Sequence, residues 1–235
     1  MPRPAMRTSC IRWISLVAAI AGSVVATAQT PPTATERAGY AGLFAAAARG
    51  DAVEITRLVA AGADVKARDG NERTPLHVAA YASQLAAMRA LVAAGADPNA
   101  LEGDRYDIVT IAAVANDSAT LALSLELGCS AKNVTSRYDG TALIAAAHLG
   151  HVEVVRVLIR AGAPLDHVNN LGWTALIESI VLGNGGARHT AIVKALVDAG
   201  ANVNLADGSA TTPLQLARRR NYAEMAAILE KAGGR

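Results

Sequence analysis

Aromatic residues are scarce in this sequence. Its 235 residues include one Phe, two Trp and five Tyr, although 52% of the chain is hydrophobic. A single conventional core in a chain of this length usually draws on more bulky side chains. Most of the apolar residues are Ala, Leu and Val, which suit close packing between short helices. The composition therefore favours a stack of local helical units over one large core.

Acidic residues are missing from the N-terminal segment, where none precedes Glu36. Three Arg residues come before an apolar run over 13–21, and small residues follow it up to Ala28. This order is typical of a secretory signal peptide. The apolar run is also shorter than the roughly 20 residues that cross a bilayer. We therefore expect residues 1–28 to be cleaved off after Ala28 and the protein to be periplasmic or secreted; a retained signal anchor is the alternative.

Cysteine is limited to Cys10 and Cys129. Removal of residues 1–28 would leave Cys129 alone, so no intramolecular disulfide could form even in an oxidising compartment. The same cleavage would remove three Arg and change the formal net charge from +2 to −1. Nucleic-acid binding would need a basic face that this balance does not supply. We expect no nucleic-acid partner, no membrane contact after cleavage, a monomer, and a packing role for the thiol of Cys129.

A seven-residue segment that begins at Thr74, TPLHVAA, has counterparts along the chain. The positions equivalent to Thr74 are 41, 74, 107, 141, 174 and 212, which gives steps of 33, 33, 34, 33 and 38 residues. A second series consists of Gly62, Gly95, Gly128, Gly162, Gly200 and Gly233. It lies 21 residues after the first series in every unit except the fifth, where the offset is 26. The two series indicate six repeats, with a five-residue insertion in the fifth that we place in a turn-rich stretch over 182–189.

The repeat unit, with its T-P-L-H-x-A-A segment, a helix break and a terminal G-A-D-x-N, resembles the ankyrin repeat. The resemblance covers about residues 38–235 and implies an all-α solenoid of about six helix-turn-helix units connected by β-hairpins or loops. We expect the repeats at about 38–68, 69–101, 102–135, 136–168, 169–206 and 207–235. Residues 29–37, QTPPTATER, are predicted to form a short flexible lead-in.

Each unit is expected to contain two helices separated by a residue that tolerates a left-handed backbone. These residues are Gly50, Ser83, Asn116, Gly150, Gly183 and Asn221, of which five are Gly or Asn. The second helix of the first unit begins with a sequence of the capping-box form at Asp51 and Glu54. The third unit carries Asp107 and Thr110 in place of the Thr and His of the motif. We therefore expect the third unit to be the least stable joint of the stack.

Motifs for catalysis and cofactor binding are missing. The sequence contains no Gly-x-Ser-x-Gly, no phosphate-binding Gly-rich loop with a Lys and no dinucleotide fingerprint. The glycines at 183–186 lack the neighbouring strand and Lys that phosphate binding needs, and they fit a flexible insertion. We therefore expect no enzymatic activity and no cofactor. His77 occupies the His of the T-P-L-H segment, to which the resemblance assigns structural hydrogen bonds.

The remaining histidines give a weak metal signal. His148 and His151 are three residues apart, a spacing that can bring two zinc ligands together. The expected helix break at Gly150 separates them, so a structural or surface role is favoured over a metal site. His167 and His189 fall in predicted loops without ligand partners. The sequence therefore predicts no bound metal.

The resemblance implies a binding surface made of loop tips and of the first-helix ends on the concave side. It selects Asn71, Arg73, Arg105, Tyr106, Arg137, Tyr138 and Trp173 near the tips, and Tyr81, His148, Arg219 and Arg220 on the helix ends. Tyr, Trp and Arg are the residue types that dominate interface energetics. Trp173 could instead pack within its own loop, and the two C-terminal Arg residues could belong to a solvated cap.

We therefore predict a protein–protein interaction module, an exported adaptor or modulator that binds an unknown folded protein. The resemblance to bacterial ankyrin proteins adds two specific versions of this role. One is regulation or protection of a periplasmic enzyme such as a catalase, and the other is toxin-neutralising immunity. Two different roles also fit the sequence. One is an enzyme or a sensor of a small ligand or metal that uses the fifth-repeat insertion and the nearby His residues, and the other is an effector that acts in a host cell.

Overall fold

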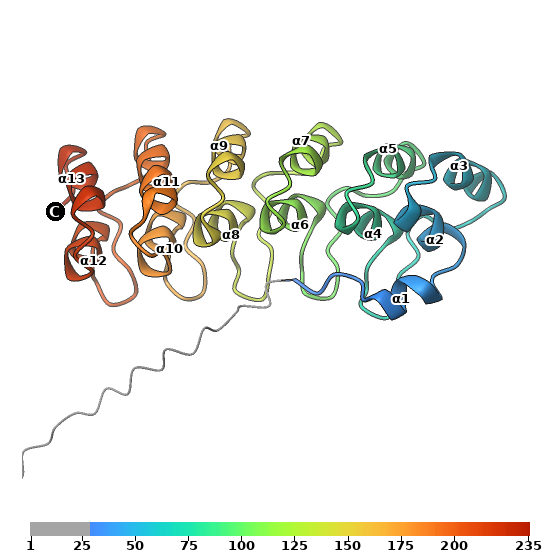
Figure 1. The fold of residues 1–235 in the computed structure, drawn as a ribbon, viewed down its shortest axis with the longest axis horizontal. Helices are drawn as coiled ribbons and strands as arrows, with labels where there is room; N and C mark the ends of the chain where they lie inside the picture. The colour runs from blue at the N-terminus through green and yellow to red at the C-terminus, as the bar shows by residue number, and fades with distance from the viewer. Residues whose placement is uncertain (1–28) are drawn as a thin grey trace, which may run out of the picture.

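Two rows of helices run along the computed structural model, which describes residues 29–235 (Figure 1). The predicted signal peptide lies outside the described residues. The first helices of the six repeats form the inner row: α2 (Gly42–Arg49), α4 (Pro75–Tyr81), α6 (Ile108–Val114), α8 (Ala142–Leu149), α10 (Ala175–Val181) and α12 (Pro213–Arg219). The second helices form the outer row: α3 (Ala52–Ala60), α5 (Leu85–Ala93), α7 (Ser118–Glu126), α9 (Val152–Arg160), α11 (Ala187–Asp198) and α13 (Ala223–Lys231). Helix α1 (Ala34–Gly39) precedes both rows, and the predicted all-α solenoid is confirmed.

The connections between repeats are loops. Over residues 29–235 no regular strand is present, and Thr135 and Gly140 form only an isolated antiparallel bridge. The hairpins that the resemblance allowed are therefore reduced to tight turns. Among the helices of this part of the chain, none combines the length and apolar character that a bilayer crossing requires.

The repeated Thr is the N-cap of the inner helices. The side chain of Thr74 accepts a hydrogen bond from the backbone N–H of His77, and Thr141, Thr174 and Thr212 cap their helices in the same way. Such caps satisfy a backbone donor that the helix itself leaves free. In the third repeat Asp107 takes this place and accepts from the N–H of Thr110 at 2.7 Å. The hydroxyl groups of Thr110 and Thr135 are 3.0 Å apart, so the altered motif keeps both a cap and a contact with the next loop.

Left-handed residues separate the two helices of a repeat at five of the six predicted positions. Ser83 is one of them, with φ of 53°, although Ser is less suited to this region than Gly or Asn. Gly183 is the exception, because it does not adopt positive φ. A Cβ at Gly183 would lie 2.1 Å from the carbonyl oxygen of Ser179, so close backbone approach explains this glycine.

The insertion in the fifth repeat lengthens a helix. Helix α11 has 12 residues, whereas the other second helices have nine, so residues 187–189 of the predicted loop are helical. The expectation that His189 lies in a loop is therefore wrong. The imidazole of His189 is buried, and its Nε2 donates to the carbonyl oxygen of His148 at 3.0 Å. The inserted residues thus add a contact between the fourth and fifth repeats.

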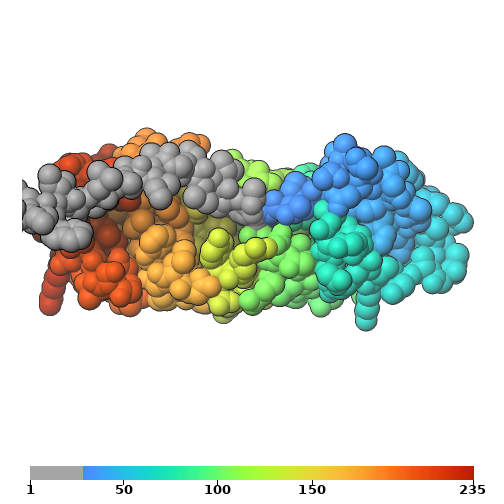
Figure 2. Space-filling model, turned by 90° about the horizontal axis from the view of Figure 1, so that it is seen from below, coloured from blue at the N-terminus to red at the C-terminus, as the bar shows by residue number. Residues whose placement is uncertain are grey.

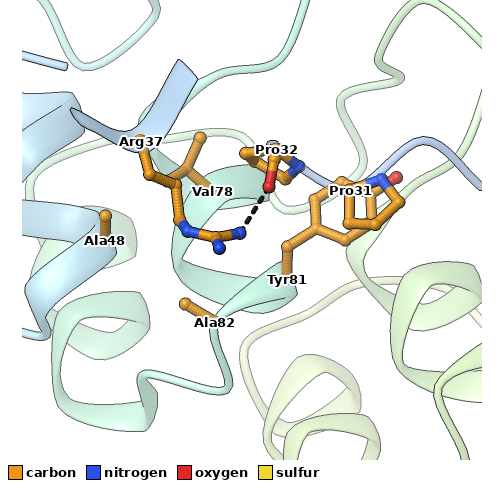
Figure 3. Close-up of a pocket in the computed structure, with 7 residues that line it drawn as sticks. All are labelled: Pro31, Pro32, Arg37, Ala48, Val78, Tyr81 and Ala82. Carbon is orange, nitrogen blue, oxygen red and sulfur yellow. Dashed lines mark hydrogen bonds between the residues drawn. The ribbon is translucent and has the colours of Figure 1, made fainter. Parts of the chain in front are cut away.

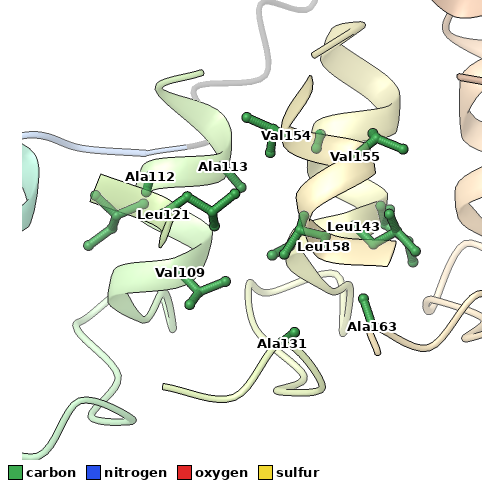
Figure 4. Packing of buried hydrophobic residues seen from close by; sticks show 14 of the residues in the cluster. Val109, Ala112, Ala113, Leu121, Ala131, Leu143, Val154, Val155, Leu158 and Ala163 are labelled. Atoms are coloured by element: carbon green, nitrogen blue, oxygen red, sulfur yellow. The ribbon is translucent and has the colours of Figure 1, made fainter. Parts of the chain in front are cut away.

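Small side chains allow the inner helices to approach closely. Consecutive alanines are fully buried in α2 and α8, at Ala46–Ala47 and Ala146–Ala147, and similar pairs occur in α4 and α6. Larger residues fill the space toward the outer row, where Leu121 and Leu158 have no exposed surface. Figure 4 shows these leucines among the helices of the third and fourth repeats. The core is therefore a continuous row of local contacts rather than one central cluster.

The segment predicted as a flexible lead-in is instead packed on the stack. Thr33 caps α1 with a complete capping box, in which Glu36 bonds back to the N–H of Thr33. Before this helix, Thr30 hydrogen-bonds Asp104 of the third repeat, and its carbonyl oxygen accepts from Arg73. We call residues 29–39 the strap. Long-range hydrogen bonds order the strap, and a composition-based prediction of flexibility does not consider them.

His77 makes the structural bonds that the resemblance implied. Its Nδ1 accepts from the N–H of Thr74 at 3.0 Å, and its Nε2 donates to the carbonyl oxygen of Ala100 at 2.9 Å. Only a neutral ring can do both. Burial lowers the pKa of His77 from 6.5 to about 4. Between these pH values the unfolded chain binds a proton that the folded chain does not, so the stability from the neutral ring is present above pH 6.5 and is lost as the pH falls toward 4.

We predict that His77→Gln reduces the pH dependence of stability. Gln215 holds the equivalent position in the sixth repeat and makes a similar cap, with its side chain accepting from the N–H of Thr212. Between pH 7 and 4.5, the free energy of unfolding of the unaltered protein should fall by roughly 2 kcal/mol more than that of the variant. Urea unfolding at both pH values measures this difference. Equal losses in the two proteins would contradict the role of His77.

Candidate protein-binding surface

The loops before five inner helices form a row of compact tips. Tips 2 to 6 comprise Asp69–Arg73, Glu102–Tyr106, Thr135–Gly140, Asn169–Trp173 and Asp207–Thr211. In each tip the N–H of the first residue donates to the carbonyl oxygen of the last, at 3.0 Å in tip 2 and 2.7 Å in tip 4. Tip 4 is one residue longer than the others, which accounts for the repeat step of 34 residues.

The first side chain of most tips fixes the turn from within. Asp69 Oδ1 accepts hydrogen bonds from the N–H groups of Asn71 at 2.9 Å and Arg73 at 3.0 Å. The side-chain oxygens of Glu102, Asn169 and Asp207 accept an equivalent pair of bonds in tips 3, 5 and 6. Side chains that bond the backbone two residues ahead hold turns rigidly. The tips are therefore preorganised to present their central side chains.

Neighbouring tips are also connected to one another. The N–H of Gly103 donates to the carbonyl oxygen of Asn71 at 3.0 Å, and the N–H of Asn170 donates to that of Tyr138 at 2.9 Å. Two ion pairs connect tips 3 and 4: Arg105 with Asp139 at 3.0 Å, and Arg137 with Asp104. The predicted residues Arg105 and Arg137 are thus exposed but already paired. They can define the border of an interface more readily than its centre.

Exposed apolar side chains lie on tips 4 and 5 and directly before them. Tyr138 and Leu171 occupy equivalent positions, three residues before the N-caps of α8 and α10, and each is 48% exposed. Val134 and Val168 directly precede the same two tips and are exposed as well. We call these four residues the tip patch. Large apolar side chains that cluster on a surface mark contact sites more often than isolated ones do.

Arg73 does not belong to the exposed surface, contrary to the prediction. Its side chain is 0% exposed and pairs with Asp69 at 2.8 Å and with Glu36 of the strap. Tyr40 donates a hydrogen bond to Asp69 at 2.7 Å, so four side chains form one network. Burial disfavours the charged guanidinium, but the hydrogen bonds to Asp69 and Glu36 outweigh it and raise the pKa of Arg73. The first repeat has no tip of its own, and Glu36 bonds tip 2 where a preceding tip would lie.

Tyr106 and Tyr81 are also less accessible than predicted. Tyr106 is 6% exposed, and burial raises its pKa to about 12. It is therefore withdrawn from the contact surface. Tyr81 lines a cavity beneath the strap together with Pro31 and Pro32, and its hydroxyl is buried without a hydrogen-bond partner (Figure 3). Figure 2 shows the strap lying across the repeats that carry these tyrosines.

The predicted residue Asn71 is exposed at tip 2, and the remaining ones lie on the C-terminal half of the inner row and its tips. His148 is half-buried, with Nδ1 3.3 Å from Oε2 of Glu178 on the next inner helix. Glu178 is almost fully buried and accepts at Oε1 from the side chain of Asn169 at 2.9 Å. Arg219 and Arg220 are exposed at the end of α12. Trp173 is half-buried at the end of tip 5, so its position is intermediate between that of a contact residue and that of a loop-packing residue.

No metal centre is formed by the histidines of residues 29–235. His151 bonds the carbonyl oxygen of Ala113 at 2.9 Å and so connects the third and fourth repeats, and His167 bonds that of Asp139 in tip 4 at 2.6 Å. Within the described chain, no three His, Cys, Asp or Glu side chains are placed to hold a metal ion. Cys129 is buried, and burial raises the pKa of its thiol. This thiol therefore has the surroundings of a packing residue.

Two features of the structure were not predicted, although the sequence contains a pattern that indicates each of them. Leu171 and Val168 are apolar residues in a loop that the repeat register places beside Tyr138, so the register pointed to an apolar patch. Thr33 and Glu36 match the Thr-x-x-Glu form of a capping box, which predicts a helix start in the supposed lead-in. Only the long-range contacts of the strap had no local signal.

Comparison with known proteins gives a consistent assignment. The family model for ankyrin repeats (three copies) matches residues 16–102 and 109–207. The ankyrin repeat protein YahD of Escherichia coli (strain K12) is 39% identical over 102 residues, which is 43% of this chain and 51% of YahD. The match thus spans about half the length of that relative.

Solved structures agree over most of the chain. An ankyrin repeat domain from Acinetobacter baumannii AYE superimposes with a TM-score of 0.77 and 44% identity, covering 82% of this chain and 98% of that domain. The ankyrin repeat domain of Bcl-3, a member of the IkappaB family, gives a TM-score of 0.74 and 28% identity, covering 84% and 88%.

The Arg73 network makes a prediction about stability. Arg73→Ala leaves the carboxylates of Asp69 and Glu36 without their buried partner, and we expect a loss of roughly 2–4 kcal/mol. Urea unfolding measures the loss, with Arg57→Ala as the control. Arg57 pairs with Glu54 at 2.7 Å on the surface of the same end of the stack, and an exposed pair of this kind contributes at most about 1 kcal/mol. Equal effects of the two variants would refute the structural role of Arg73.

Proposed function

Since this chain belongs to the ankyrin-repeat family, we propose that it is an exported adaptor or modulator that binds one folded protein. The family assignment itself indicates a protein–protein interaction module, and the repeat scaffold is typically non-enzymatic. The finer proposal concerns where the partner binds. We place the contact on the tip patch and on the adjoining inner-helix ends of repeats 4 to 6.

The tip patch is the observation that carries this proposal. Tyr138 and Leu171 project from two tips whose backbones are hydrogen-bonded to one another, so they meet a partner as one rigid unit. The ion pairs of Arg105 and Arg137 lie beside these residues, between tips 3 and 4. An apolar centre with a polar border is the usual arrangement of a protein interface. Fixed tips also reduce the ordering entropy that binding must overcome.

The inner-helix ends extend this surface. His148 and Arg219 each lie seven residues after the N-cap of their helix, at the ends of α8 and α12, and the exposed Leu182 directly follows α10. These three side chains differ in charge and size, although all lie at inner-helix ends. A regular scaffold with varied side chains can select one partner among many. The partner that fits best has a convex apolar element for the tips and polar groups for the helix ends.

Export is the second part of the proposal, and it rests on the N-terminal sequence. We expect the purified protein from periplasmic or culture fractions to begin at Gln29. N-terminal sequencing tests this expectation, and Val17→Asp, which interrupts the apolar run, is the control that should block processing. A protein that begins at Met1 in those fractions would contradict cleavage after Ala28.

The tip patch makes a direct prediction about binding. Tyr138→Ala combined with Leu171→Ala should reduce capture of the native partner at least tenfold, because truncation of central interface side chains typically weakens binding by about 2 kcal/mol or more. Pull-down from the native compartment followed by quantitative mass spectrometry measures the reduction for each captured protein. Val53→Ala is the matched control, since Val53 is 82% exposed on α3, away from the tips.

Both variants should keep the circular dichroism spectrum and the urea midpoint of the unaltered protein, because the substituted side chains are exposed. A partner captured by the control and lost by the double variant identifies the ligand of the patch. Undiminished capture of every partner by the double variant would refute the proposed surface.

A further inference from the structure

The strap lies along the inner side of the second and third repeats. Its first residues are extended and make hydrogen bonds over a wide span: Gln29 Nε2 donates to the carbonyl oxygen of Thr110 on α6 at 3.0 Å. Thr30 Oγ1 donates to Asp104 of tip 3 at 3.1 Å, and the carbonyl oxygen of Thr30 accepts from Arg73 at 3.0 Å. The strap therefore occupies this face as a bound extended peptide would.

Proline residues of the strap rest on the inner helices. Pro31 and Pro32 line a cavity of about 230 Å³ with Ala48 of α2 and with Val78 and Tyr81 of α4 (Figure 3). Arg37 closes the cavity from the side of α1 and donates to the carbonyl oxygen of Pro32. An aromatic ring beside prolines is a common way to hold an extended proline-containing peptide.

This contact is incomplete. The cavity remains between the strap and the inner helices, and the buried hydroxyl of Tyr81 has no hydrogen-bond partner. Core contacts of folded proteins leave few voids, and buried polar groups are normally paired. The inner face thus has space and a hydrogen-bonding group that the strap leaves unoccupied. A different occupant could fill the space and bond the hydroxyl of Tyr81.

The acidic end of the strap has a preformed receptor. Arg73 is fixed by its ion pair with Asp69 at 2.8 Å, and this leaves Nη2 directed at Glu36. Asn71 donates to the same Glu36 oxygen at 2.6 Å. A guanidinium that is already oriented binds a carboxylate with less loss of entropy than a free one. The recognition elements are therefore an extended Pro-Pro segment and a carboxylate four residues after the second proline.

We propose that this inner face of repeats 2 and 3 is a peptide-binding groove whose occupant is exchangeable. Its ligand is an extended segment of a partner protein with consecutive prolines followed by a carboxylate, and the strap occupies the groove in cis until such a segment displaces it. This inference rests on the proposed function in one respect, namely that the inner face serves protein binding. It adds a second site, distinct from the tip patch, and states the chemistry of its ligand.

The experiment uses an acetylated, fluorescein-labelled peptide of residues Thr30 to Tyr40 and the full-length protein. Pro31→Gly, Pro32→Gly and Glu36→Gln together should release the strap, and Thr35→Ala, at an exposed strap residue, is the control. Fluorescence anisotropy should show at least tenfold tighter peptide binding to the released variant than to the unaltered and control proteins. The reason is that an occupied groove lowers the apparent affinity in proportion to the open fraction.

Two further measurements identify the site. A peptide with Glu36→Gln should bind the released variant at least tenfold more weakly, because it lacks the carboxylate for Arg73. A second variant combines Thr30→Cys with Asp104→Cys, at two side chains that are in contact. Its disulfide should hold the strap in the groove when oxidised, so that the peptide binds only after reduction. Cys10 is replaced by Ser in this protein and Cys129 is buried, so neither should interfere with this disulfide.

Equal peptide affinity for the released and unaltered proteins, or no binding to either, would overturn the proposal. A dimer of the unaltered protein in size-exclusion chromatography that dissociates when the strap is released would also overturn it, since the groove would then hold the strap of a second copy. The pull-down with Tyr138→Ala and Leu171→Ala measures partner capture by the tip patch independently of the peptide experiment. Failure of the peptide experiment with intact capture would therefore refute the groove and leave the tip patch standing.

Discussion

Each repeat can bury its apolar side chains only against its neighbours, because two helices of seven to twelve residues are too short to enclose a core of their own. Everything else in the structure follows from this need for neighbours. The buried Ala pairs of the inner helices let adjacent repeats approach closely, and the tip-to-tip backbone bonds align the loops. Stability is therefore distributed along the row, and each end repeat lacks a neighbour on one side. Other contacts replace that neighbour. At the N-terminal end, α1 and Glu36 bond tip 2 where a preceding tip would lie. At the C-terminal end, Asn204 bonds the carbonyl oxygen of Gly233 and the N–H of Arg235.

The register of the stack could be predicted from the sequence because its signals are local. The Thr that caps an inner helix and the Gly that ends an outer helix each act within four or five residues, so their positions fix the units wherever they occur. The strap could not be predicted in the same way. Its Pro and Thr residues have the local composition of a linker, and its order depends on Arg73 and Asp104, more than 35 residues away. Composition indicates whether an isolated segment is ordered, whereas the order of the strap comes from its contacts with distant residues.

The exposure of the tip residues was predicted less well, because single side chains within a tip point in different directions. Arg73 and Tyr106 both directly precede an N-cap, where the chain turns inward to begin the helix, and both are buried. Tyr138 and Leu171 precede the N-cap by three residues, at the outermost part of the loop, and both are exposed. Assigning all tip residues to the surface ignored this alternation. A register that distinguishes the two positions would have retained Tyr138, added Leu171 and removed Arg73.

The division of the inner face between strap and open surface limits how a partner can bind. The four side chains of the tip patch are too few for a stable interface, which buries about 800 Å² on each protein. Additional area can come from the inner-helix ends of repeats 4 to 6, or from repeats 2 and 3 after the strap has left. The second route gains area but must also break the hydrogen bonds of Thr30 and Glu36. A partner confined to the first route binds without any change in the N-terminal half, whereas one that uses the second couples its binding to release of the strap. Under the proposed exchange of the strap, the same stack distinguishes partners by whether they carry a segment that replaces it.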